Sequence, residues 1–131
     1  MSVELRMLTF SVVLGIVQII AASHAASLQR GYKWTASSRD EKVEPLRGVA
    51  GRLDRALRNF GETFPLFVAV ILVAHATDTH DVLTEWGARL YLWGRVAYVL
   101  LYAAGVPVIR SLVWNVATIG IGLIVAALLF G

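Results

Sequence analysis

The chain has 131 residues, of which 57% are hydrophobic and only 16% are charged, and its mean hydropathy is +0.67. This composition excludes a disordered chain and an ordinary soluble domain, and it is typical of an integral membrane protein. The chain has no cysteine, which excludes disulfides and a protein thiol nucleophile, so any thiol chemistry must use the thiol of another molecule.

The sequence predicts an all-α integral membrane protein, with residues 1–131 forming one domain that contains a four-helix transmembrane bundle. The expected spans cover about residues 7–28, 49–76, 86–104 and 111–130. The first and last spans contain no charged residue, and each is long enough to cross the hydrocarbon as a helix. The second span is apolar only from Phe64 onward, so its helix must begin in water or in a polar cavity. The third span carries Arg95 near its middle.

Lysine and arginine are distributed unequally between the connections. The expected loop over about residues 29–48 contains Arg30, Lys33, Arg39, Lys42 and Arg47, whereas residues 77–85 contain acidic residues and neither lysine nor arginine. Because these residues accumulate in cytoplasmic loops, we expect the first and third connections to be cytoplasmic and both termini to be periplasmic in a bacterial inner membrane. The basic residues of the loop alternate with acidic ones beside the bilayer, so we expect contact with membrane lipid and not with nucleic acid.

Two polar stripes carry the candidate chemistry. At 100° per residue, four polar residues of the second span lie within roughly 80° of arc on one helix face: Arg52, Arg55, Asn59 and Glu62. A second stripe on the third span has 4, 3 and 4 spacing and consists of Tyr91, Arg95, Tyr98 and Tyr102. A purely structural interpretation pairs Arg95 with Glu62 inside the bundle. If the stripes are adjacent, however, they form a pocket with excess positive charge, which suits a small polyanion or zwitterion.

Three segments of the sequence form a recognisable set: Arg55-Ala-Leu-Arg-Asn-Phe-Gly-Glu-Thr-Phe-Pro-Leu-Phe, then Tyr91-Leu-Trp-Gly-Arg-Val-Ala-Tyr with Tyr102, and finally Pro107-Val-Ile-Arg-Ser. Together they resemble the MAPEG family, the membrane-associated proteins in eicosanoid and glutathione metabolism. The family includes microsomal glutathione transferases and microsomal prostaglandin E synthase. The resemblance implies a homotrimer of four-helix protomers that binds glutathione at the subunit interfaces. It also implies a lipophilic electrophile or a lipid hydroperoxide that enters from the bilayer.

By position, the resemblance implies a catalytic role for Arg110, whose guanidinium would stabilise the glutathione thiolate. It implies glutathione-binding roles for Arg30, Arg55, Arg58, Asn59, Glu62, Arg95, Tyr98 and Tyr102. Glu62 suits the ammonium group of glutathione, and the arginines suit its carboxylates. Arg30 is equally well interpreted as a side chain that reaches the membrane interface. No metal site is expected, because the three histidines are scattered along the chain.

We therefore expect an integral-membrane glutathione-dependent enzyme, either a glutathione transferase or a peroxidase that reduces lipid hydroperoxides. Isomerisation stays open as well. Thr63 stands where the leukotriene-forming member of the family has tyrosine and where the prostaglandin synthase also has threonine, while the turn before Arg110 is one residue shorter than in that synthase. A non-catalytic lipid-binding or scaffold member of the same fold is one alternative. A small proton-coupled exporter that uses Glu62 is another, but Arg55, Arg58 and Arg95 would repel a cationic substrate and hold Glu62 ionised.

Overall fold

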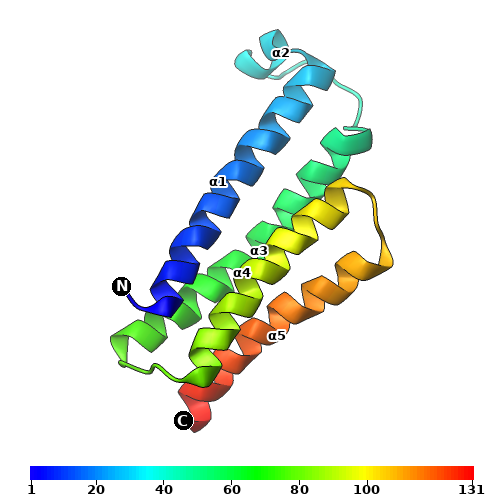
Figure 1. Cartoon of the computed structure of the whole chain (residues 1–131). Helices are drawn as coiled ribbons and strands as arrows, with labels where there is room; N and C mark the ends of the chain where they lie inside the picture. Colours follow the sequence, from blue (N-terminus) through cyan, green and yellow to red (C-terminus); the bar gives the residue numbers. More distant parts are fainter.

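The computed structural model describes all 131 residues, and the chain is helical apart from short connections. The helices follow in the order α1 (Val3–Arg30), α2 (Tyr32–Ala36), α3 (Gly48–Ala76), α4 (Val82–Ala103) and α5 (Val108–Phe130). Four of them are long and run side by side with alternating direction, while α2 is a short helix at one end of the bundle (Figure 1). Three of the four, α1, α3 and α5, have the length and the apolar composition needed to cross a membrane. The expected all-α integral membrane architecture is confirmed.

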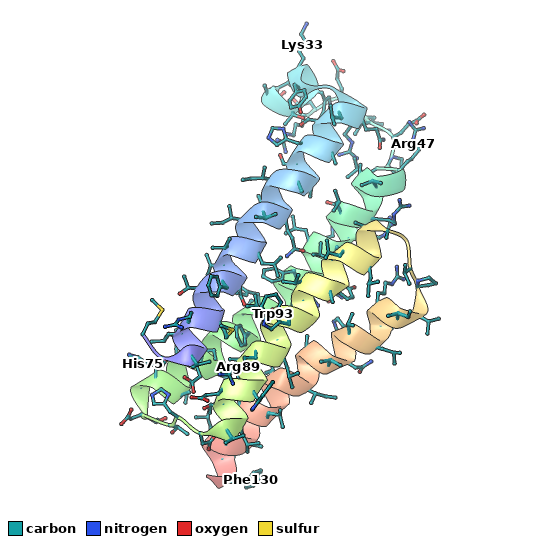
Figure 2. All side chains as sticks on the ribbon, in the orientation of Figure 1. Lys33, Arg47, His75, Arg89, Trp93 and Phe130 are labelled. Atoms are coloured by element: carbon teal, nitrogen blue, oxygen red, sulfur yellow. The ribbon has the colours of Figure 1, made fainter.

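The two ends of the bundle differ in character. One end, which we call the loop end, holds residues 31–47 and the turn between α4 and α5, whereas the other, the terminal end, holds both chain termini and the turn between α3 and α4 (Figure 1). Figure 2 shows Lys33 and Arg47 at the loop end and His75 and Phe130 at the terminal end. The first and third connections thus lie together, and the side of the membrane that they occupy stays a prediction.

The connection after α1 is more structured than the expected loop. It contains α2, which begins directly after Gly31, whose φ of 97° lies in the region that favours glycine. The hydroxyls of Ser27 and Thr35 are 2.8 Å apart and join the two helices. Further along, the Gln29 side chain donates to Pro45 O at 3.1 Å and accepts from Arg47 N at 2.8 Å. These bonds hold the connection against the end of α1.

Helices α4 and α5 pack closely near the terminal end through small residues. A Cβ added to Gly120 would lie 2.5 Å from the carbonyl oxygen of Gly87, and one added to Gly94 would lie 2.9 Å from Cβ of Ala117. Small residues at such a crossing let two membrane helices approach backbone to backbone. Toward the loop end, α5 diverges from α4 (Figure 1). The close crossing therefore determines where the first turn of α5, with its polar residues, lies relative to α4.

Candidate anion-binding site

A cavity of about 270 Å³ lies near the loop end, between α3, α4 and α5. We call it the α3–α5 cavity; it is lined by Asn59, Tyr98, Tyr102, Arg110, Ser111, Trp114 and Asn115. Two expected stripes contribute to it, because α3 supplies Asn59 and α4 supplies the two tyrosines. Arg110 joins them from the first turn of α5, after a tight turn in which Gly105 has a φ of 79°.

Two arginines meet at the ring of Tyr102. The Cζ atom of Arg110 lies 4.3 Å from the centroid of this ring, and Arg55 Nε donates a hydrogen bond of 3.1 Å to the Tyr102 hydroxyl. Neither arginine takes part in an ion pair of the structure. Their positive charges are therefore not neutralised by the protein, and this part of the cavity is complementary to an anion.

Arg95 does not pair with Glu62, which was the purely structural interpretation of the two stripes. Its side chain is only 1% exposed, and its Nη1 donates to Oδ1 of Asn59 at 2.8 Å. Its guanidinium also stacks over the ring of Tyr98, with 4.3 Å between Cζ and the ring centroid. Arg95 thus lies behind two residues that line the α3–α5 cavity and is not itself part of the lining. Glu62 is exposed on α3, one turn beyond Asn59, and forms no ion pair.

The structure separates Arg30 and Arg58 from this cavity. Both line a second cavity of about 380 Å³ between α1, α3 and the first connection, together with Pro45, Leu46, Gly51, Asp54 and Arg55. Arg58 is largely exposed and forms an ion pair with Asp54 at 3.1 Å. Arg30 Nη2 donates to Glu44 O at 3.2 Å. Within the chain, the expected glutathione-binding residues that line a cavity are therefore divided between two cavities, and Glu62 and Arg95 line neither. Arg55 connects the two, because it lines the second cavity and donates to Tyr102 of the α3–α5 cavity.

Ser111, Trp114 and Asn115 line the α3–α5 cavity but were not among the expected site residues. Together with Arg110 they form two i,i+4 pairs at the start of an otherwise apolar span, and that spacing was the available signal. Arg52, by contrast, was on the expected polar face but donates to Ala103 O at 2.9 Å. It satisfies a carbonyl at the end of α4, which is a structural role.

A separate polar cluster lies at the terminal end. Glu4 is 2% exposed, accepts a hydrogen bond from Thr84 Oγ1 at 2.7 Å and lies 3.2 Å from Nδ1 of His80. The sequence did not single out Glu4, because a lone acid before an apolar run is normally solvated. Here it joins the first turn of α1 to the first turn of α4.

Antiparallel helices, three of them long and apolar enough to span a membrane, around a cavity with unneutralised arginines define a helical membrane protein with a candidate anion-binding site. The sequence profile of the MAPEG family matches residues 7–130, and the chain therefore belongs to the MAPEG family. The resemblance seen in the sequence is thereby confirmed. Membership suggests a glutathione-related membrane enzyme. No curated protein and no solved structure was found to match the chain.

Proposed function

We propose that the protein is an integral-membrane enzyme that uses glutathione to conjugate lipophilic electrophiles or to reduce lipid hydroperoxides. The observation that carries this proposal is the pair of unneutralised arginines, Arg55 and Arg110, at the Tyr102 ring in the α3–α5 cavity. Glutathione brings carboxylates, which Arg55 can bind with charge-assisted hydrogen bonds, and a thiol, whose anionic form Arg110 can stabilise. The tyrosine hydroxyls and the Asn59 amide supply neutral partners for its peptide groups.

Arg110 suits the catalytic role, because it lines the cavity and its N–H donors have no protein partner. It forms no side-chain hydrogen bond or ion pair in the structure, and its charge is held in place only by the Tyr102 ring. When bound, glutathione supplies the thiol nucleophile. A guanidinium beside a thiol favours the thiolate, which is the reactive form. Exposed apolar residues adjoin Arg110 on α5, among them Val108, Ile109 and Leu112, so a lipophilic reactant can approach from the bilayer.

The division of the expected residues over two cavities supports a site shared between protomers, as the expected homotrimer requires. Arg30 and Arg110 line separate cavities of one protomer, on the α1 side and on the α5 side of α3. A cyclic assembly that sets the α1–α3 face of one protomer against the α3–α5 cavity of the next would bring them together. It would also cover Glu62, an exposed carboxylate well inside α3 that a lipid environment disfavours.

We predict that the protein purified in lipid nanodiscs has the mass of a trimer. Co-expression of Arg30→Ala and Arg110→Ala protomers should then restore part of the activity that each variant lacks alone. A trimer that contains both variants has one interface with a complete site. There the Arg30→Ala protomer supplies its intact Arg110 and the Arg110→Ala protomer supplies its intact Arg30. A stable monomer or dimer, or mixed assemblies without restored turnover, would contradict a site shared between protomers.

Glutathione binding tests the site itself. Truncating Arg55, Asn59 or Glu62 to alanine removes one hydrogen bond or ion pair to the ligand, which should weaken binding about ten- to hundredfold. Calorimetric titration of each variant measures the change. Arg89→Ala is the matched control, because Arg89 lies on α4 near the terminal end, beside Glu85, and should leave affinity unchanged (Figure 2). Unchanged affinity in all three site variants would show that glutathione binds elsewhere or not at all.

The first connection is expected on the cytoplasmic side. The chain has no cysteine, so a single introduced cysteine reports on one position. We predict that Ser37→Cys, in the exposed first connection, reacts with an impermeant maleimide only after the cells are permeabilised. Ala76→Cys, exposed at the opposite end of the bundle, should react in intact cells. The reverse labelling pattern would invert the proposed topology.

A further inference from the structure

The hydrogen bond between Arg95 and Asn59 determines how the Asn59 amide is oriented. A guanidinium carries only donors, so the atom of Asn59 that it contacts at 2.8 Å must be the carbonyl oxygen. The amide makes no other hydrogen bond in the structure, so both N–H groups of Nδ2 are without a protein partner. Because Asn59 lines the α3–α5 cavity, these two donors are available to a ligand there.

Arg95 itself is out of reach of such a ligand. Its Nε and Nη2 atoms are fully buried and have no hydrogen-bond partner, and its third nitrogen is used by Asn59. Aromatic rings occupy its surroundings, with Cζ 4.3 Å from the Tyr98 ring centroid and 5.7 Å from that of Phe60. Cation–π contacts hold the guanidinium in place where no carboxylate pairs with it.

We propose that Arg95 is a positioning residue that holds the Asn59 amide with both Nδ2 donors toward the cavity. The ligand group that this arrangement selects is an oxygen acceptor, a carboxylate or a peptide carbonyl of a glutathione-like peptide, and the inference thus rests on the proposed function. The positive charge has a second effect, because a charge-assisted bond to Oδ1 polarises the amide and strengthens its N–H groups as donors. Arg95 therefore acts on the ligand through Asn59 and does not contact it.

A double-mutant cycle on glutathione affinity separates positioning from direct contact. Asn59→Ala and Arg95→Met should each weaken binding by about tenfold, the effect of one lost hydrogen bond. The double variant should be no weaker than Asn59→Ala alone, because Arg95 has nothing left to orient. Arg95→Gln keeps a donor for Oδ1 and should recover most of the affinity. Additive losses, near a hundredfold in the double variant, would mean that Arg95 contacts the ligand itself and would overturn the proposal.

Asn59→Asp provides a second test that does not depend on the fold tolerating a change at Arg95. A carboxylate at this position pairs with the buried guanidinium and should raise the thermal midpoint of the protein, while the loss of both N–H donors should weaken glutathione binding at least tenfold. Wild-type affinity in this variant would refute the role of Asn59 as a donor, and a lower thermal midpoint would refute its contact with Arg95. If the wild type itself binds no glutathione, the proposed function fails, whereas the thermal midpoints still test the Arg95–Asn59 contact.

Discussion

Arg110→Ala should lower turnover by roughly 10²- to 10³-fold, the typical effect of removing one group that stabilises developing negative charge. Glutathione affinity should change little, because the contact of Arg110 strengthens only as the thiol loses its proton. Arg55 and Tyr102 keep their 3.1 Å hydrogen bond in the variant, so that part of the cavity persists. The ultraviolet absorbance of the thiolate, recorded while the enzyme with glutathione is titrated with base, should show a higher pKa of the bound thiol than in the wild type.

Arg89→Ala serves as the control for this experiment too, since Arg89 lies toward the terminal end (Figure 2), whereas the cavity is near the loop end and Arg89 does not line it. An Arg110→Ala variant with the wild-type thiolate titration and the wild-type turnover of chlorodinitrobenzene would remove Arg110 from the mechanism. A wild-type protein that forms no thiolate and shows no turnover, yet retains bound lipid, would favour the non-catalytic lipid-binding alternative.

Gly120→Leu should have the largest effect on stability. A Cβ at this position would lie 2.5 Å from the carbonyl oxygen of Gly87 and 3.0 Å from the backbone nitrogen of Tyr91. Backbone atoms cannot rotate away, so α5 must move off α4, and overpacking of this kind costs about 1–3 kcal/mol or more. Thermal unfolding in nanodiscs should show a clearly lower midpoint. Activity should fall as well, because the same helix carries Arg110.

Gly122 offers a matched control on the same helix. It is exposed, and no atom would lie within 4 Å of an added Cβ. Gly122→Leu should therefore leave both the thermal midpoint and the turnover near the wild-type values. If both substitutions had the same effect, intrinsic helix preference or lipid contact would explain the loss, and the close crossing of α4 and α5 would not.

The helices themselves were predictable, because a membrane requires each span to satisfy its backbone hydrogen bonds internally and to present apolar side chains. Length and hydropathy therefore located α1, α3 and α5 directly. Helical periodicity also placed Arg55 and Asn59 on neighbouring parts of one face of α3, and both contact groups of α4, Tyr102 and Arg95 respectively. These are local properties, which depend on the spacing of residues along one helix.

The partners of the polar residues, in contrast, were decided by tertiary structure. Arg95 was open to an ion pair with Glu62, yet it bonds to Asn59, and Arg58 turns to Asp54 away from the α3–α5 cavity. Sequence spacing predicts which residues share a helix face. It does not predict the rotation of the helix about its own axis, and this rotation decides which neighbouring helix that face meets. That rotation depends on backbone approach, such as the crossing of Gly87 with Gly120. The same crossing sets the position of α5, which brings the unpredicted Ser111, Trp114 and Asn115 into the site beside Arg110. Only the packed bundle therefore decides which charges are neutralised and which remain free for a ligand.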